Sequence, residues 1–523
     1  METPLTPLDF ARRARRLYGG REAVIDGDER FTYEQFFARC DRWSAQLQRL
    51  GVKPGDRVAY IAPNTHQQLE SFYAVPQAGA VLVPINYRLS PDEFAYIINH
   101  SGARVVCADP DHVEAVDGIR ASLPTAEHFV ALGGPRSGWL DYEALVAEGP
   151  GEYHAPPIGE GDLLTINYTS GTTARPKGVM ITHRNAYTDV VGALVHVPMT
   201  PATRYLWTLP MFHANGWTFV WRITAVGGTH VCLRRIEPDR VFTLCRDLKV
   251  NLLCAAPTVL IMLANAPEEA RRKAPRGVRV FTAGAPPASA TIGRIEGELG
   301  WEITHVYGLT ETSPFISICE PRPEHAQLSS EQRAVVKARQ GVELITSGDL
   351  RVVDEHDREV PHDGETLGEI VVRGNVVMKG YFNDEQATDA VIRNGWFHTG
   401  DAAIVHPDGY LEVRDRIKDV IISGGENISS VEVEGVLLRH PAVREVAVVG
   451  FPDEKWGEVP HAFVVRRADA AVTEAELVGF AREHLARFKV PKAVEFVDDL
   501  PRTATGKIQK YVQRGQRSAI ARQ

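Results

Sequence analysis

The stretch Tyr168-Thr-Ser-Gly-Thr-Thr-Ala-Arg-Pro-Lys177-Gly178 continues the apolar run LLTINY, which begins at Leu163. It contains two glycines, four Ser/Thr hydroxyls and one lysine in eleven positions. Backbone N–H groups and hydroxyls in such a loop can wrap a polyphosphate, and the lysine adds positive charge. A solvated Ser/Thr-rich turn would have the same composition. The stretch is not a Walker A loop, because Pro176 stands where that motif needs its second glycine.

On both sides of this stretch, helical and strand patterns alternate. Thr32 and Gln35 predict a capping box, and apolar residues then recur at helical spacing up to Leu50, with Gly51 as the C-cap. The short apolar run 58–62 follows as a strand, and the same alternation fills the first 130 residues and resumes from 181 to 310. This alternation predicts βαβ units and a mostly parallel, helix-covered sheet.

The pattern changes in the last third of the chain. From about 340 to 415, short strands and turns predict an antiparallel β-rich subdomain. After 417 we expect a compact α+β segment, with helices near 430–440 and 473–487. The fold class is therefore α/β: a large N-terminal domain of βαβ-type layered sheets plus a β-rich subdomain, and a small α+β C-terminal domain beyond a boundary near 416.

Composition excludes several classes of protein. The 523 residues include 58 Lys and Arg against 67 Asp and Glu, so the net charge is −9 and offers no basic footprint for nucleic acid. No apolar run approaches the roughly 18–20 residues of a membrane span. The six cysteines form no C-x-x-C pair, which predicts a reduced, cytoplasmic protein. G-x-G-x-x-G, H-E-x-x-H and G-x-S-x-G motifs are absent from the sequence.

Seven further segments carry a family resemblance together with the opening stretch. In chain order they are PMFHANGW (210–217), TAGAP (282–286), YGLTET (307–312), GWFHTGD (395–401), RDRIKD (414–419), SGGENI (423–428) and PRTATGK (501–507). Their order and spacing resemble the adenylate-forming superfamily, which includes acyl-CoA synthetases, adenylation domains of peptide synthetases and firefly luciferase. The resemblance covers essentially the whole chain and is nearest to the acyl-CoA synthetase and fatty-acid–CoA ligase branch.

The resemblance implies two half-reactions that use ATP, Mg²⁺ and CoA. A carboxylate first joins the α-phosphate of ATP to give acyl-AMP and pyrophosphate, and the acyl group then passes to the CoA thiol. Glu311 is implied as the Mg²⁺ ligand, and a hard carboxylate oxygen suits that ion. Lys507 is implied as the lysine that bridges the carboxylate and ATP during adenylation. The expected catalytic residues are Lys507, Glu311, His213 and Thr310.

The resemblance also implies a nucleotide site. Tyr307 would stack on adenine opposite 284–286, and Asp401 would accept both ribose hydroxyls with help from Arg416. Ala174 departs from the glycine of many relatives, and we expect ATP use to survive this change. The expected ATP- and AMP-binding residues are Thr169, Ser170, Gly171, Thr172, Thr173, Lys177, Gly284, Ala285, Pro286, His305, Tyr307, Gly308, Asp401 and Arg416.

The resemblance further implies that the C-terminal domain is mobile. We expect an N-terminal domain over 1–415, a hinge over 416–418 and a mobile C-terminal domain over 419–523, with rotation at Lys418 between the two steps. One face would present Lys507 and the other a pantetheine channel. Without the resemblance, Lys507 would be a solvated charge and Phe488 a core residue. The expected CoA-binding residues are Gly424, Gly425, Trp456, Phe488 and Lys492.

The motifs specify the reaction more closely than they specify the carboxylic acid substrate. His213 stands where amino-acid-activating relatives carry an Asp, which argues against an amino acid substrate. Phe212, Gly216 and Trp217 are expected in an acyl pocket for a fatty or short-to-medium-chain acid. A bulky cyclic acid, a thioether acid, or transfer to a carrier protein or an amine remain alternatives, as does a nucleotide-binding protein with a degenerate site. The expected partners are small molecules, without nucleic acid, and a homodimer is left open.

Overall fold

The expected alternation of strands and helices produces two large sheets. The computed structural model describes residues 2–169, 175–285, 287–424, 426–467, 470–502, 508–510 and 512–514. The first sheet has eight strands in the order β19-β9-β8-β4-β3-β5-β6-β7, parallel except where β9 pairs with β8 and β19. Its strands are β3 (Arg57–Ile61), β4 (Val81–Ile85), β5 (Ala103–Ala108), β6 (His128–Ala131), β7 (Leu140–Asp141), β8 (Leu163–Thr169), β9 (Lys177–Thr182) and β19 (Gly380–Tyr381).

The second sheet has nine strands in the order β16-β15-β14-β13-β12-β10-β11-β1-β2. Its six central strands are parallel and its ends are antiparallel. The strands are β1 (Glu22–Asp26), β2 (Glu29–Thr32), β10 (Arg204–Leu206), β11 (Thr229–Val231), β12 (Leu252–Ala255), β13 (Arg279–Thr282), β14 (Glu302–Gly308), β15 (Phe315–Ile318) and β16 (Val342–Glu343).

Helices cover these sheets, and one of them is buried along its whole length. The capping box predicted at Thr32 and Gln35 opens α2. Every residue of α3 is buried, and α3 packs against strands of both sheets. The helical segments before the C-terminal unit are α1 (Leu8–Tyr18), α2 (Tyr33–Arg49), α3 (His66–Gln77), α4 (Pro91–Ser101), α5 (Val113–Ile119), α6 (Tyr142–Glu148), α7 (His183–His196), α8 (Ala214–Trp217), α9 (Phe219–Val226), α10 (Pro238–Asp247), α11 (Pro257–Ala264), α12 (Glu268–Arg271), α13 (Ser289–Arg294), α14 (Ser330–Lys337) and α15 (Glu385–Val391).

The β-rich region predicted after 340 is confirmed as an antiparallel sheet of five strands. In this sheet, β21 pairs with β22 so that Asp401 lies directly opposite Arg416. The chain leaves the sheet at Arg416, where β22 ends. The strands are β17 (Asp349–Val353), β18 (Gly368–Arg373), β20 (Ile392–Arg393), β21 (Trp396–Val405) and β22 (Leu411–Arg416).

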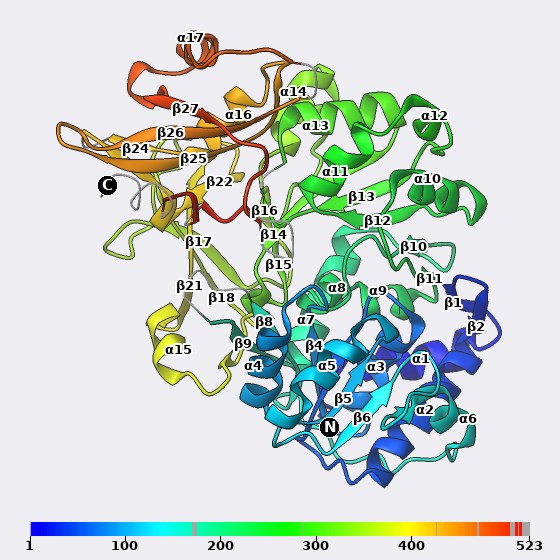
Figure 1. Cartoon of the computed structure of the whole chain (residues 1–523). Coiled ribbons are helices and arrows are strands. Elements are labelled where there is room, and N and C mark those ends of the chain that lie inside the picture. Colours follow the sequence, from blue (N-terminus) through cyan, green and yellow to red (C-terminus); the bar gives the residue numbers. More distant parts are fainter. Residues whose placement is uncertain are drawn as a thin grey trace.

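The residues after Asp419 form an α+β unit with its own hydrophobic cluster, drawn from residues between 421 and 496. Figure 1 shows this unit, in orange and red, at the end of the molecule opposite the blue N-terminal helices. None of the helices in the described part of the chain is long and apolar enough to cross a membrane. The elements of the unit are β23 (Ile421–Ser423), β24 (Glu426–Ile428), α16 (Ser430–Leu437), β25 (Val443–Asp453), β26 (Gly457–Arg466), α17 (Glu474–His484) and β27 (Ala493–Phe496).

Candidate active site

Tyr307 and Glu311 belong to one tight strand–turn–strand connection, with Tyr307 in the first strand and Glu311 in the turn. The strand β14 ends at Gly308, which pairs with Phe315 at the start of β15. A Cβ atom on Gly308 would lie 1.7 Å from the carbonyl oxygen of Pro314, so only glycine fits there. Between the strands, Thr310, Glu311 and Thr312 form one 3₁₀ turn. The close backbone approach therefore projects Glu311 from the end of the second sheet.

Asp401 joins Tyr307 to Arg416. The Tyr307 hydroxyl donates to Asp401 Oδ2 at 2.7 Å, and Arg416 Nε pairs with Asp401 Oδ1 at 2.8 Å. Burial and the Asp401 carboxylate raise the pKa of Tyr307 well above its ordinary value, so its hydroxyl stays protonated and donates. The Asp401 carboxylate likewise raises the pKa of Arg416. Three residues expected in one site are thus in direct contact.

Glu311 has a partner that the sequence reasoning missed. The hydroxyl of Tyr381 donates to Glu311 Oε1 at 2.9 Å, and Lys177 Nζ lies 4.8 Å from the centre of the Tyr381 ring. Burial and the Glu311 carboxylate raise the pKa of Tyr381, which keeps it a donor. We call Tyr307, Glu311, Tyr381, Asp401 and Arg416 the Asp401 cluster. The only available signal was Tyr381's place in the short motif MKGYF.

The lysine of the opening stretch stands at the base of a hairpin. Thr169 at the end of β8 pairs with Lys177 at the start of β9. After β13, Gly284 and Ala285 are exposed, and Gly284 has a φ of +92° that favours glycine. Seven of the expected site residues lie outside the described residues, namely Ser170, Gly171, Thr172, Thr173, Pro286, Gly425 and Lys507.

His305 lies inside the protein rather than on its surface. Its side chain is 2% exposed, and Nδ1 donates to the carbonyl oxygen of Ala338 at 3.0 Å. Burial lowers the pKa of His305 to about 4, so the ring is neutral at physiological pH. His305 is therefore an uncharged residue of β14, and its contact with adenine remains a prediction.

The segment expected in the acyl pocket has an unusual backbone. Ala214, Asn215, Gly216, Trp217 and Thr218 have φ values of 44°, 56°, 56°, 52° and 60°, so all five are left-handed. Left-handed backbone costs roughly 1–2 kcal/mol per residue other than glycine, and less for asparagine. A Cβ on Gly216 would lie 2.5 Å from the Trp207 ring. The surrounding structure must therefore hold this turn in place.

Buried polar side chains supply part of that hold. The Asn64 side chain donates to the carbonyls of Trp207 and Leu209 and accepts from the Met211 N–H. The Asn215 side chain accepts from Asn167 at 2.9 Å. These hydrogen bonds hold the chain just before the turn and Asn215 within it.

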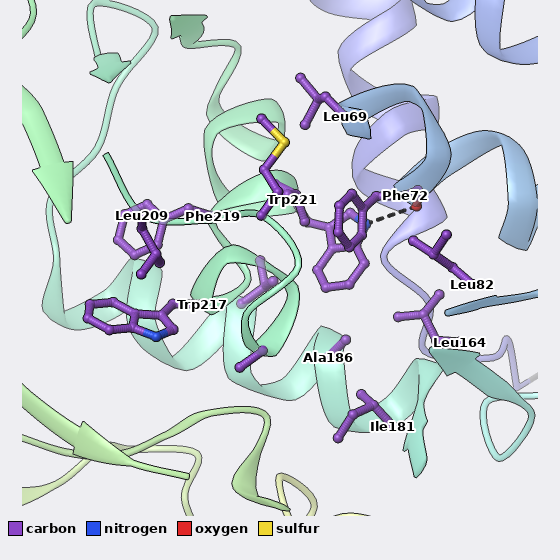
Figure 2. Packing of buried hydrophobic residues seen from close by; sticks show 14 of the residues in the cluster. Leu69, Phe72, Leu82, Leu164, Ile181, Ala186, Leu209, Trp217, Phe219 and Trp221 are labelled. Carbon is purple, nitrogen blue, oxygen red and sulfur yellow. Dashed lines mark hydrogen bonds between the residues drawn. The ribbon is translucent and has the colours of Figure 1, made fainter. Parts of the chain in front are cut away.

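Trp217 forms an apolar wall with a residue from the Glu311 segment. Phe212 and Trp217 are buried, and the Trp217 ring lies 5.6 Å from that of Phe315 in a T-shaped arrangement. Figure 2 shows Trp217 in the cluster that also contains Phe72 of α3. We call Phe212, Gly216, Trp217 and Phe315 the Trp217 wall. Phe315 was missed because nothing in the sequence connects it with Trp217, 98 positions earlier.

The residues expected to bind CoA lie in the C-terminal unit. The Gly424 N–H donates to the Trp456 carbonyl at 2.7 Å, and a Cβ on Gly424 would lie 2.8 Å from the Trp456 ring. Trp456 and Phe488 are 41% and 43% exposed, so neither is a core residue. Lys492 is exposed, and its N–H donates to the Pro460 carbonyl. Gly424 and Trp456 thus lie together, and the side chains of Trp456, Phe488 and Lys492 reach solvent.

Comparison with known families assigns the chain. Residues 10–382 match the model of the AMP-binding enzyme family, and residues 432–507 match that of the AMP-binding enzyme C-terminal domain. The chain belongs to the AMP-binding enzyme family. This confirms the recognition made from the sequence motifs and the α/β fold class.

Relatives of this AMP-binding enzyme match it over nearly full length. The peroxisomal trans-cinnamate:CoA ligase of Petunia hybrida is 42% identical over 97% of this chain and 93% of its own. The 4-hydroxybutyrate–CoA ligase 2 of Metallosphaera sedula is 43% identical over 99% and 95%. The acetate–CoA ligase CCL3 of Humulus lupulus is 41% identical over 98% and 94%. The protein is an AMP-forming acid–thiol ligase of the acyl-CoA synthetase branch, with ATP and CoA as substrates.

Solved structures give the same result for the fold. The anthranilate CoA ligase AuaEII in complex with anthranoyl-AMP has a TM-score of 0.88 at 25% identity, over 99% of both chains. The fatty acyl CoA synthetase of Mycobacterium tuberculosis has a TM-score of 0.75 at 32% identity, over 98% of this chain and 99% of its own.

Proposed function

We propose that this enzyme forms the CoA thioester of an acid with an apolar acyl group, of fatty or short-to-medium chain length. The observation that carries this proposal is the Trp217 wall, because Trp217 and Phe315 present buried aromatic rings beside the segment that holds Glu311. His213 replaces the carboxylate that would pair with an ammonium group. Relatives named for acetate, 2-methylpropanoate and trans-cinnamate support an apolar acyl group, whereas the relative named for 4-hydroxybutyrate uses an acid with a terminal hydroxyl.

In the first half-reaction, a carboxylate oxygen of the acid bonds to the α-phosphorus of ATP, and the bond to the pyrophosphate oxygen breaks. Asp401 accepts the ribose hydroxyls through the lone pairs left by Tyr307 and Arg416, which orients the nucleotide. Thr310, Lys177 and the stretch 169–173 donate to phosphate oxygens. Lys507 would place its ammonium group between the acid carboxylate and the phosphate, where its positive charge would reduce the repulsion between the two anions.

Glu311 fits a Mg²⁺ ion. Tyr381 occupies Oε1 and leaves lone pairs free on this half-buried carboxylate. No group of three or more His, Cys, Asp or Glu side chains suited to a metal occurs among the described residues. A single carboxylate together with phosphate oxygens is the arrangement in which Mg²⁺ commonly binds. The ion supplies positive charge that offsets charge on the phosphates.

In the second half-reaction, the CoA thiolate attacks the acyl carbonyl carbon and AMP leaves. We propose the division 1–415, hinge 416–418 and mobile 419–523 for this step. The separate hydrophobic cluster of the C-terminal unit and the exposed side chain of Lys418 support it. Rotation would separate Asp415 from Ser430, whose N–H donates to that carboxylate at 2.8 Å. Gly424, Gly425, Trp456, Phe488 and Lys492 would then hold CoA.

One pooled incubation tests the proposal. The purified protein is given Mg²⁺, ATP and a set of acids from acetate to palmitate with several aryl and cyclic acids, with and without CoA. Mass spectrometry reads acyl-AMP, acyl-CoA and AMP. We expect an apolar acyl-CoA that appears only with CoA. A preference for a polar or amino acid, or acyl-AMP that accumulates while CoA is unused, would contradict the proposal.

Location and assembly remain predictions. All six cysteines are buried free thiols, which supports a reducing compartment such as the cytoplasm. Three of the relatives are named as peroxisomal, namely trans-cinnamate:CoA ligase, probable acyl-activating enzyme 5 and acetate/butyrate–CoA ligase AAE7. Fractionation of the source cells would test the compartment, and light scattering of the purified protein would test the homodimer.

A further inference from the structure

A buried carboxylate connects the two halves of the Trp217 wall. Asp189 lies in α7 and is 1% exposed. It accepts three hydrogen bonds: from Thr218 Oγ1 at 2.5 Å, from Arg222 Nη2 at 2.5 Å and from the Phe315 N–H at 3.1 Å. Thr218 closes the left-handed turn, and Phe315 begins β15 four residues after Glu311. One side chain therefore holds three segments that are far apart in the sequence.

The position of Thr218 makes its bond to Asp189 important for Trp217. Thr218 is the last of the five left-handed residues, and right-handed α9 begins at the next residue. The hand of the backbone thus reverses at Thr218, where a β-branched residue has an unfavourable φ of 60°. The bond to Asp189 holds the chain at that reversal, one residue after Trp217.

Arg222 is placed poorly for stability alone. Its guanidinium is fully buried between the rings of Phe219 and Phe315, with Cζ 4.8 and 4.6 Å from their centres. Within the described part of the chain, Nε and Nη1 have no hydrogen-bond partner. A buried cation with unpaired donors carries a desolvation cost that an apolar side chain would avoid. The arrangement instead gives Asp189 a charged partner that packs directly against the Trp217 wall.

We propose that Asp189 is a positioning residue that sets the depth of the acyl pocket and aligns it with Glu311. It joins the turn that bears Trp217 to the segment that bears Phe315 and Glu311, and the hydrogen bond from Arg222 holds the carboxyl group in place. The two rings of the wall are thereby held at one separation, and the acid's carboxylate enters at one place relative to the phosphates. This inference rests on the proposed function, because it takes the Trp217 wall to be the acyl pocket.

The test removes one hydroxyl and no ionisable group. Thr218→Val removes the hydroxyl that lies 2.5 Å from Asp189 Oδ2 and 2.7 Å from the Trp217 carbonyl oxygen, and it keeps the branched shape. Thr218→Ser keeps the hydroxyl. Thr224→Val is the control: Thr224 lies in α9 and, like Thr218, is buried. Its hydroxyl accepts from the Tyr73 hydroxyl at 2.7 Å and lies near the Val220 carbonyl and His230 Nε2, and no hydrogen bond joins it to Asp189. Each variant is assayed for KM and kcat with acids from acetate to octanoate, for KM with ATP, and for Tm.

We expect Thr218→Val to raise the KM of the preferred acid about tenfold and to flatten the dependence of kcat/KM on chain length. Its KM for ATP should stay within about twofold of the original value, because the Asp401 cluster is untouched. Thr218→Ser should restore the original chain-length profile. Thr224→Val should lower Tm to a similar extent and leave the profile unchanged.

Two outcomes would overturn the inference. In one, Thr218→Val keeps the original acid KM and chain-length profile. In the other, Thr224→Val changes the profile in the same way, which would make the effect a general loss of packing. If Thr218→Val does not fold, Thr218→Ala repeats the test without a β-branched side chain at a positive φ. The acid preference of the unmodified enzyme tests the proposed function separately. A polar preferred acid would contradict that function, and the differences between the variants and the unmodified enzyme would still test the role of Asp189.

Discussion

Asp401 lies in an antiparallel strand pair, whereas Trp217 lies in a left-handed turn of five residues. Within the Asp401 cluster, Asp401 and Arg416 are cross-strand neighbours, and side-chain hydrogen bonds join Tyr307 to Asp401 and Tyr381 to Glu311. The turn that bears Trp217 is held by hydrogen bonds from buried polar side chains, Asp189 and Asn167 among them. The residues proposed to bind the nucleotide thus contact one another directly, whereas the wall proposed to bind the acyl group depends on the side chains packed behind it.

The largest expected effect separates the two half-reactions. Lys507→Ala should lower the rate of acyl-AMP formation about 10²–10³-fold, because a charge aimed at the reacting phosphate is lost. Formation of the thioester from supplied acyl-AMP should be largely spared. Rapid-quench assays of the two steps measure this. Equal loss of both steps would contradict the role assigned to Lys507.

Asp401→Asn should weaken ATP use without changing the choice of acid. Asp401→Asn removes the charge that pairs with Arg416 and one of the carboxylate acceptors, so kcat/KM for ATP should fall about 10²-fold. The order of preference among acids should not change, because the Trp217 wall is intact. Competition assays with mixed acids give that order. A changed preference would show that the two halves are coupled.

The acyl half is tested by Trp217→Ala. Removal of the indole should deepen the pocket and raise kcat/KM for octanoate relative to butyrate by about tenfold, since each buried CH₂ contributes about 0.8 kcal/mol. The KM for ATP serves as the internal control and should stay near its original value. An unchanged ratio between the two acids would place the acyl chain elsewhere.

Tyr381→Phe tests the support of Glu311. Loss of the hydroxyl removes one hydrogen bond at 2.9 Å, so we expect the Mg²⁺ concentration for half-maximal activity to rise about three- to tenfold. Titration of Mn²⁺ binding in the presence of ATP by electron paramagnetic resonance gives a second readout. Unchanged metal affinity would make Tyr381 a packing residue.

The smallest expected effect is on the pH dependence of folding stability, at a histidine outside both the Asp401 cluster and the Trp217 wall. Burial opposes the charged form of His66, but its hydrogen bonds with Asp26 and Glu143 raise its pKa to about 9. Since the folded-state pKa exceeds the unfolded value, this contribution is fully present below about pH 6.5 and is lost as the pH rises through 9. We expect a loss of about 1–3 kcal/mol over this range.

The variant His66→Gln shows whether this histidine causes the pH dependence. Its Tm should be lower than that of the original enzyme near pH 6 and should change less between pH 6.5 and 9.5. Thermal denaturation across this range measures both. An equal slope in the two proteins would assign the pH dependence to other groups.

The sequence motifs identified four of the five residues of the Asp401 cluster, all except Tyr381. Tyr307, Asp401 and Arg416 were expected in one site and are in contact. The capping box at Thr32 and the C-terminal helix beginning at Ser430 are also confirmed. These features were predictable because local hydrogen bonding and hydrophobic spacing act over a few residues, and ligand-binding residues occur in recognisable motifs.

Other features could not be predicted. Tyr381 reaches Glu311 from 70 positions away, and Asp189 reaches the Phe315 N–H from 126 positions away. No periodicity or short motif reports such a pair. The left-handed turn was also missed, because only Gly216 and Asn215 among its five residues favour a positive φ.

The sequence by itself determined the family, the chemistry and the order of strands and helices. These depend on residue types at fixed spacing, and spacing is a property of the chain alone. Only the tertiary structure decided which carboxylate joins Thr218 to Phe315 of the Trp217 wall and which hydroxyl donates to Glu311. Those partners meet because two sheets and the helices between them pack at short distances, and packing joins residues without regard to their separation in the sequence.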